Sequence, residues 1–304
     1  METELILDYG SGTVAARLEK NEKTLLEDVR IRVYAGECLA LIGETGSGKT
    51  MTALSVMRLL PENVRMRDGV LRFAGKEYPA GQSLRSLLGV EIVYIPQNGL
   101  EFLNPSKKVR YHLYDSLKKL GVPRAQRPAR AAEALRAVGF DEPEALLDKY
   151  PFQLSGGMAQ RVTIALAACS RARLVLADEA TNGLDRAATA DFIAMLGRLF
   201  PDAAKLIITH DIQVAALCDR TQVLCGGRTM ECGPSGQVLS APRHPYTKAL
   251  IAALVENGMR ETPLLREQAG PCPFYRRCGA ACEACLAPLQ ARAENGTEWW
   301  CSGG

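Results

Sequence analysis

The chain has 304 residues, of which 47% are apolar and 23% are charged, and its formal net charge is +3. This composition is typical of a globular protein with one full-sized core and a smaller appended part. The 37 basic and 34 acidic residues are mixed along the chain, so no block of one sign indicates a nucleic-acid or anionic-membrane partner, and charge says little about partners.

The amino-terminal segment shows no targeting pattern. Residues 1–8 lack a basic region followed by an apolar stretch, and no window contains the about 18 apolar residues that a membrane span needs. We therefore expect a cytoplasmic protein that reaches the inner face of the cell membrane only through partners. The ten cysteines divide into two groups of five, the first of which is scattered in apolar stretches and is expected to consist of buried thiols: Cys38, Cys169, Cys218, Cys225 and Cys232.

Short apolar runs predict strands that are buried on both faces of a parallel sheet, at residues 38–42, 174–177 and 206–208. A glycine loop and a helix-like stretch, 50–60, follow the first run, and Pro61 ends that helix. Between about 100 and 150 the residues are those typical of helices, most clearly at 124–138. We predict an α/β nucleotide-binding domain over 1–233, with a helical subdomain at about 100–160, and a separate extension over 234–304.

The glycine loop fits the pattern G-x-x-x-x-G-K-[ST] and predicts a phosphate site for ATP. Glycines let the backbone turn so that its N–H groups face phosphate oxygens, and a flexible glycine loop is the alternative. Lys49 is expected to reach the β- and γ-phosphates, and the Thr50 hydroxyl to bind Mg²⁺. The predicted ATP-binding residues of this loop are Gly43, Glu44, Thr45, Gly46, Ser47, Gly48, Lys49 and Thr50.

Two acids, Asp178 and Glu179, end the predicted strand at 174–177. This places Asp178 where it can hold Mg²⁺ through water, and Glu179 where it can polarise an attacking water. Alone, such a pair more often marks a solvated edge or a helix cap. The phosphate loop upstream favours the catalytic interpretation.

Residues 154–161, Leu-Ser-Gly-Gly-Met-Ala-Gln-Arg, precede the acidic pair and resemble the signature motif of ABC ATPases. Physically they form a second anion site, in which Ser155 and the N–H groups of Gly156 and Gly157 begin a helix. The resemblance implies that this site meets the γ-phosphate of a partner cassette's ATP. It also implies the fold: a RecA-like parallel core with an antiparallel β part and a helical subdomain.

Further residues match the family's motifs in the family's order. Gln97 resembles the Q-loop glutamine that touches Mg²⁺ and the attacking water, Asp185 lies in a D-loop-like Leu-Asp pair, and His210 resembles the switch histidine at the γ-phosphate. Without these neighbours, a lone histidine after a strand would be a structural residue.

The chain departs from the family pattern at three places. Ala180 stands where the family usually has proline, and Asn182 with Gly183 replaces the usual small residues. Both changes put the turn that carries Glu179 in doubt. Tyr9 is the candidate adenine-stacking aromatic, with an ordinary strand residue as the alternative.

The tail contains residues 241–250, which resemble the segment after the cassette in peptide and nickel importers. In that branch four cysteines follow, and the resemblance favours a [4Fe–4S] cluster over zinc or reduced thiols. The spacing selects Cys272, Cys278, Cys285 and Cys301, although Cys282 leaves the third ligand open. A cluster here would cross-link a tail too small for its own core.

The resemblance implies an ATP-hydrolysing subunit of an importer. Its expected partners are a second, non-identical cassette, two permease subunits and an extracellular substrate-binding protein, with a permease docking near 97–105. A soluble ABC ATPase acting on ribosomes or DNA and a cassette that binds ATP without hydrolysing it are the alternatives. Dipeptides, oligopeptides, nickel and metal chelates all remain open as substrates.

Overall fold

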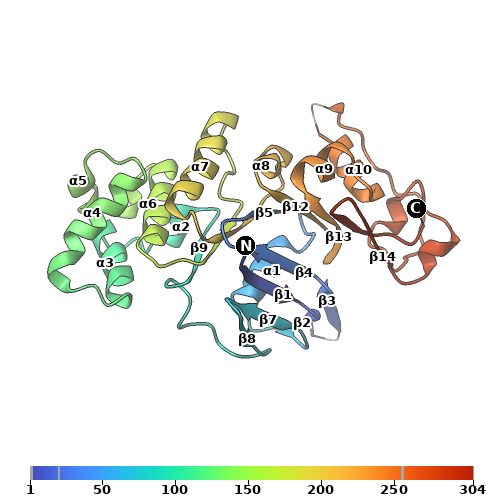
Figure 1. Cartoon of the computed structure of the whole chain (residues 1–304), viewed down its shortest axis with the longest axis horizontal. Helices are drawn as coiled ribbons and strands as arrows, with labels where there is room; N and C mark the ends of the chain where they lie inside the picture. Colours follow the sequence, from blue (N-terminus) through green and yellow to red (C-terminus); the bar gives the residue numbers. More distant parts are fainter. Residues whose placement is uncertain (1–2, 20, 255–256, 304) are drawn as a thin grey trace.

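The computed structural model describes residues 3–19, 21–254 and 257–303. Figure 1 shows the helices between β9 and β10 at one end of the molecule and the carboxy-terminal residues at the opposite end, with the sheets between them. No helix in these described ranges is long and apolar enough to span a membrane.

An eight-stranded sheet runs through the molecule in the order β14-β15-β13-β12-β5-β11-β10-β9. From β12 to β9 neighbouring strands are parallel, and β5, β10 and β11 are buried along their whole length. The three predicted strands are thereby confirmed. The strands are β5 (Cys38–Ile42), β9 (Ile92–Ile95), β10 (Leu174–Asp178), β11 (Ala204–Ile208), β12 (Arg220–Cys225), β13 (Arg228–Pro234), β14 (Ala291–Glu294) and β15 (Thr297–Trp300).

Two smaller antiparallel sheets cover one side of this core. Their orders are β4-β1-β7-β8 and β3-β2-β6. Apolar residues of these strands pack with those of β5 and α1 in one buried cluster. The strands are β1 (Leu5–Gly10), β2 (Thr13–Arg17), β3 (Glu22–Glu27), β4 (Arg30–Tyr34), β6 (Val64–Met66), β7 (Val70–Phe73) and β8 (Lys76–Tyr78).

The helices between β9 and β10 form the helical subdomain. Leucines and alanines at helical spacing build its core. This core is continuous with a second buried cluster, which includes residues of the parallel strands β5, β10 and β11. Its last helix runs to residue 168, beyond the expected limit near 160. The helices are α2 (Gly99–Phe102), α3 (Val109–Lys119), α4 (Arg127–Ala137), α5 (Pro143–Leu147) and α6 (Gly156–Ala168).

The remaining helices flank the sheet: α1 (Lys49–Val56), α7 (Arg186–Leu199), α8 (Ile212–Ala216), α9 (Ser235–Ser240) and α10 (Pro245–Ala252). The carboxy-terminal extension, which the sequence predicts as a separate part over 234–304, adds two strands to the main sheet. Its β14–β15 hairpin pairs with β13, with Trp299 opposite Glu231. The extension therefore continues the main sheet, and its position relative to the nucleotide-binding core is fixed by backbone hydrogen bonds.

Candidate nucleotide-binding site

An open pocket of ≈ 510 Å³ lies where the parallel strands β5, β9 and β10 end. Most of its lining comes from the predicted phosphate loop and from the residues that follow the other strands. This edge is where parallel α/β sheets bind ligands, because the turns after the strands converge there. The lining residues are Leu25, Thr45, Gly46, Gly48, Lys49, Thr50, Met51, Gln97, Glu179, Asn182 and His210.

The phosphate loop is shaped by glycines that have no room for a side chain. Gly43 has φ +156°, and a Cβ there would lie 2.2 Å from the Leu224 carbonyl oxygen. Gly48 has φ +104° at the start of α1, and a Cβ there would lie 2.7 Å from the Leu26 side chain. The curvature of the loop therefore requires glycine at both positions.

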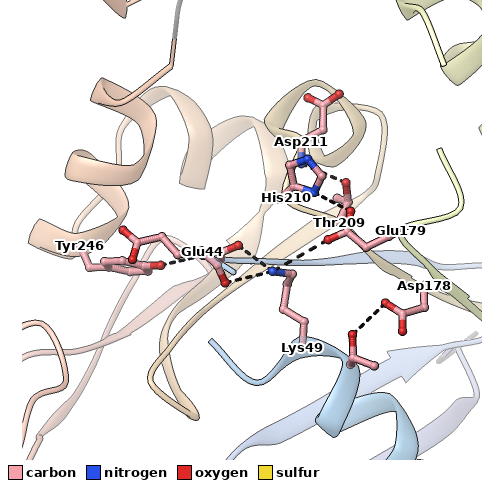
Figure 2. A network of polar contacts seen from close by, with 10 residues as sticks. Glu44, Lys49, Asp178, Glu179, Thr209, His210, Asp211 and Tyr246 are labelled. Atoms are coloured by element: carbon pink, nitrogen blue, oxygen red, sulfur yellow. Dashed lines mark hydrogen bonds and ion pairs between the residues drawn. The ribbon is translucent and has the colours of Figure 1, made fainter. Parts of the chain in front are cut away.

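Lys49 is buried beneath the loop. Its Nζ donates to the Gly43 carbonyl oxygen at 2.8 Å and to that of Glu44 at 3.1 Å, and it lies 4.0 Å from Glu179 Oε1. Burial lowers the pKa of Lys49, and the nearby carboxylates of Glu179 and Asp178 oppose that shift. The ammonium is thus held at the centre of the loop beside the acidic pair (Figure 2).

Asp178 ends β10 and is buried. Its Oδ1 accepts from the Thr50 hydroxyl at 3.4 Å, and its Oδ2 accepts from the Tyr94 hydroxyl at 3.2 Å. Burial raises the pKa of Asp178, while the hydrogen bonds from Tyr94 and Thr50 lower it. The structure therefore places the Thr50 hydroxyl beside the Asp178 carboxylate, and both carry oxygen atoms of the kind that Mg²⁺ prefers.

Glu179 adopts a left-handed backbone, with φ +50°. Such a conformation is costly for a side chain with a Cβ and is typical of functional sites. Its N–H donates to the Ile208 carbonyl oxygen at 2.8 Å, and its Oε2 lies 2.6 Å from His210 Nδ1. The turn closes without proline, because the Asn182 N–H donates to the Glu179 carbonyl oxygen at 3.0 Å and Ala180 is buried.

The signature residues lie outside this pocket. Ser155 caps α6 by accepting from the Met158 N–H at 3.2 Å, and Gly156 and Gly157 are exposed beside it. Asp185 caps α7 by accepting from the Ala188 N–H at 2.8 Å and is also exposed. The chain thus separates the residues assigned to its own ATP from those assigned to a partner's ATP.

Gln97 follows β9 and lines the pocket. The signature helix touches the same turn, because Gln160 Nε2 donates to the Pro96 carbonyl oxygen at 3.0 Å. A Cβ at Gly99 would lie 2.7 Å from the Ala159 backbone, so α2 and α6 pack in direct contact. A movement of the helical subdomain would therefore displace Gln97.

Tyr9 does not fit the role of adenine-stacking residue. Its ring is fully buried among the strands of the antiparallel part, and its hydroxyl is hydrogen-bonded to Ser55 of α1. Burial raises the pKa of Tyr9 to about 12. The alternative, an ordinary strand residue, is what the structure shows, because a β1 side chain at this register points into the core.

The tail cysteines gather in one region without converging on one point. Burial raises the pKa of Cys272 to about 11, and the thiols of Cys278, Cys301 and Cys285 raise it further. The Sγ atoms of Cys282 and Cys285 lie 4.0 Å apart. Within residues 3–19, 21–254 and 257–303, no three His, Cys, Asp or Glu side chains form a group that could hold a metal ion. This arrangement does not support the predicted metal centre. In the other group of cysteines, Cys169 is half-buried and the rest are buried as expected.

Sequence reasoning missed three residues that contact the site. Tyr94 donates to Asp178, and Tyr246 and Arg277 of the extension contact Glu44. Tyr94 lies three positions before Gln97 on the same strand end, which is a usable signal. Nothing local marks the other two, since Tyr246 and Arg277 lie 202 and 233 positions from Glu44.

Comparison with known proteins agrees with this geometry. The family model described as "ABC transporter" matches residues 26–182, and "Oligopeptide/dipeptide transporter, C-terminal region" matches residues 230–285. The chain is 37% identical over 245 residues to "Nickel import ATP-binding protein NikD" of Rhodospirillum rubrum, covering 80% of this chain and 92% of that protein. It is 34% identical over 277 residues to "Dipeptide transport ATP-binding protein DppD" of Escherichia coli, covering 86% and 85%.

The fold has close counterparts among solved structures. The dimeric ATP-binding cassette MJ0796 bound to ADP and Pi gives a TM-score of 0.66 at 22% identity, covering 76% of this chain and 99% of that chain. At this identity the likeness concerns the fold. Together with the family match and the relatives above, it shows that the chain belongs to the ABC transporter family, as an ATP-hydrolysing, ATP-binding subunit of the kind that powers import.

Proposed function

We propose that this subunit powers the uptake of a peptide or of nickel. The observation that carries the proposal is the match of residues 230–285 to the oligopeptide/dipeptide transporter C-terminal region, in a chain whose phosphate-loop residues line an open pocket. The printed names of the relatives divide between nickel and dipeptide transport, so both substrate classes are retained. Substrate choice lies with the subunits that contact the substrate.

The pocket supplies the groups that ATP hydrolysis needs. Lys49 and the N–H groups of residues 46–50 hold the phosphates, and Glu179 accepts the proton of the attacking water. His210 fixes one Glu179 oxygen at 2.6 Å, which leaves the other oxygen, 4.0 Å from Lys49, facing the pocket. Gln97, which also lines the pocket, contributes its amide.

Thr50, Asp178 and Gln97 are the proposed Mg²⁺ residues. Their oxygens suit this ion, and Thr50 Oγ1 lies 3.4 Å from Asp178 Oδ1 in the described structure. When bound, Mg²⁺ would neutralise phosphate charge. Burial raises the pKa of Asp178, and a bound cation would favour the charged carboxylate.

A second, non-identical cassette is the proposed partner for the exposed signature. Ser155, Gly156, Gly157 and Asp185 all face solvent. In a head-to-tail pair, the start of α6 would meet the γ-phosphate in the other chain. Two permease subunits and an extracellular binding protein would complete the importer, and they would place this subunit peripherally on the inner face of the membrane.

The turn around residues 97–105 is the proposed docking surface for a permease. Phe102 is 51% exposed, while its neighbour Leu103 is buried and anchors the turn. An exposed apolar ring on the turn that follows Gln97 suits a partner helix. Contact there would be transmitted to Gln97 and, through Gln160, to the signature helix.

The resemblance of the tail to that of peptide and nickel importers favours a [4Fe–4S] cluster, with zinc as the alternative. The described thiols do not converge, so we derive no step of hydrolysis from such a group. Iron, sulfide and zinc contents of the anaerobically purified chain test this point. About four irons per chain would support a cluster, and metal-free protein would leave the cysteines as thiols.

A tagged chain purified from the membranes of its source cell tests the function. Recovery of two permeases and a second cassette is the expected result, and the associated binding protein can then be titrated with peptides and nickel. Recovery of ribosomes or DNA-repair proteins instead would favour the soluble ABC ATPase. A fully assembled transporter whose turnover is unaffected by Glu179→Gln would favour the cassette that binds ATP without hydrolysing it at this site.

A further inference from the structure

The extension contacts the phosphate loop directly. Tyr246, on α10, is fully buried, and its hydroxyl accepts the backbone N–H of Glu44 at 3.0 Å. Figure 2 shows this contact on the side of the loop opposite His210 and Glu179. A residue of the carboxy-terminal extension thus touches the ATP site of the cassette.

The peptide unit that Tyr246 contacts is the one that also holds Lys49. Its N–H, that of Glu44, donates to Tyr246, and its carbonyl, that of Gly43, accepts from Lys49 Nζ at 2.8 Å. In a planar trans peptide the two groups point in opposite directions. Fixing the N–H therefore fixes the carbonyl that orients Lys49, and each bond polarises the other.

A second contact acts on the Glu44 side chain. Arg277 Nη2 lies 2.8 Å from Glu44 Oε2, and this hydrogen bond is the main cause that raises the pKa of Arg277. The guanidinium also lies over the Phe274 ring at 5.3 Å, and that ring meets Tyr246 edge-on at 5.3 Å. One cluster of the extension thus holds both the backbone and the carboxylate of Glu44.

The tail segment around Phe274 also packs against the turn that contacts the phosphate loop. A Cβ at Gly226 would lie 2.7 Å from the Pro273 ring, so the extension packs closely on the turn after β12. The next residue of that turn, Gly227, donates its N–H to the Ser47 carbonyl oxygen at 2.8 Å. Two separate stretches of the phosphate loop therefore depend on this face of the extension.

We propose that Tyr246 and Arg277 are positioning residues of the ATP site. Tyr246 holds the Gly43–Glu44 peptide in the orientation that aims Lys49. Arg277 neutralises and restrains the Glu44 carboxylate, which would otherwise repel the triphosphate at the rim of the loop. The extension is thus a working part of nucleotide binding in addition to its pairing with the sheet.

Tyr246→Phe in the full-length chain removes the acceptor and keeps the ring. We expect the Kd for ATP, measured by calorimetry with Mg²⁺, to rise about threefold to tenfold, because one buried N–H loses its partner. In the assembled ATPase KM should rise while kcat changes little, since Glu179 and His210 are untouched. Tyr275→Phe is the matched control, because this ring packs on Gly270 and Arg266 in the same tail. An unchanged Kd in Tyr246→Phe, or an equal change in both variants, would overturn the role of Tyr246.

A double-mutant cycle tests Arg277. Arg277→Gln should weaken ATP binding about twofold to fivefold at low salt, the range of a partly exposed ion pair. Adding Glu44→Gln should restore binding, because the unpaired charge is gone; a general defect in folding would not be rescued. Equal losses in Arg277→Gln and in the double variant would overturn the role of Arg277. If Tyr246→Phe fails to fold, this cycle still tests whether the extension acts on the phosphate loop through Glu44.

The inference rests on the chain being an ATPase subunit, and the two can fail separately. A wild-type chain that binds no ATP would overturn the assignment of the phosphate site. A wild-type chain that binds ATP with variants indistinguishable from it would overturn only the positioning role. The binding cycle requires neither permeases nor a transported substrate.

Discussion

Glycines lie at or next to the start of both α1 and α6, and the surroundings of these two helix starts differ. At the start of α1, Gly43 and Gly48 have no room for a Cβ, and Lys49 is buried under the loop. At the start of α6, a Cβ at Gly156 or Gly157 would meet nothing within 4 Å. The first anion site is enclosed and oriented by its own chain, whereas the second is capped by Ser155 and open.

This difference between the two anion sites predicts that ATP binding and ATP turnover depend on different parts of the molecule. Preorganised donors hold a phosphate without rearranging, so the anion site at α1 should bind ATP in the isolated chain. The anion site at α6 has the dipole and the free N–H groups of a helix start, but no other part of the described chain encloses it. We therefore expect the site at α6 to act only when a second cassette encloses it.

Of the proposed substitutions, Glu179→Gln at the enclosed site beside α1 should have the largest effect, which is on turnover. The amide keeps the shape and can still contact His210, but it cannot take the proton of water, so turnover of the assembled transporter should fall about 10²- to 10⁴-fold. ATP binding should persist, as measured by calorimetry. Glu77→Gln, at an exposed acid paired with Arg72, is the control. Undiminished turnover in the first variant would contradict the assignment.

Lys49→Ala should affect binding itself. The loss of a buried charged donor from the phosphate loop should weaken ATP affinity about 10- to 100-fold. Lys118→Ala, at an exposed lysine in the last turn of α3, should leave the affinity unchanged. Equal affinities for the two variants would show that the phosphates bind elsewhere.

Acid should loosen the start of α10. Burial lowers the pKa of His244 to about 4, and its Nδ1 accepts the Tyr246 N–H at 2.9 Å, a bond that protonation removes. A depressed folded pKa gives stability that is present above the unfolded value of 6.5 and is lost as pH falls toward 4, up to about 3 kcal/mol. His244→Asn keeps a cap without a titrating group, so its melting temperature should depend less on pH in this window. Identical pH profiles would contradict this cause.

Ser155→Ala should have the smallest effect on the isolated chain. The loss of this helix cap should cost about 1 kcal/mol in unfolding free energy. ATP affinity of the isolated chain should not change, because Ser155 lies outside the pocket, while turnover of the assembled transporter should fall. Ser155→Thr retains a capping hydroxyl and should recover the stability. A weakened affinity in isolated Ser155→Ala would mean that the two halves interact within one chain.

The sequence predicted those parts of the molecule that short-range chemistry determines. The glycine loop before α1, the acids ending β10 and the Ser155 cap each depend on a few consecutive residues, so their patterns are visible in the text. The sequence leaves Tyr9 open between an adenine-stacking residue and an ordinary strand residue, because its spacing from the loop says nothing about which face of β1 it occupies. The contacts of Tyr246 and Arg277 with Glu44 and the joining of β15 to β13 depend on packing between distant segments. No local pattern encodes them.

The most direct test measures ATP binding and ATP hydrolysis side by side, on the isolated chain kept monomeric, as verified by light scattering, and on the assembled transporter. The account predicts saturable ATP–Mg²⁺ binding in both samples, with turnover negligible in the monomer and present in the assembly. Full turnover by the monomer would contradict it, because the exposed signature at α6 would then have no part in hydrolysis.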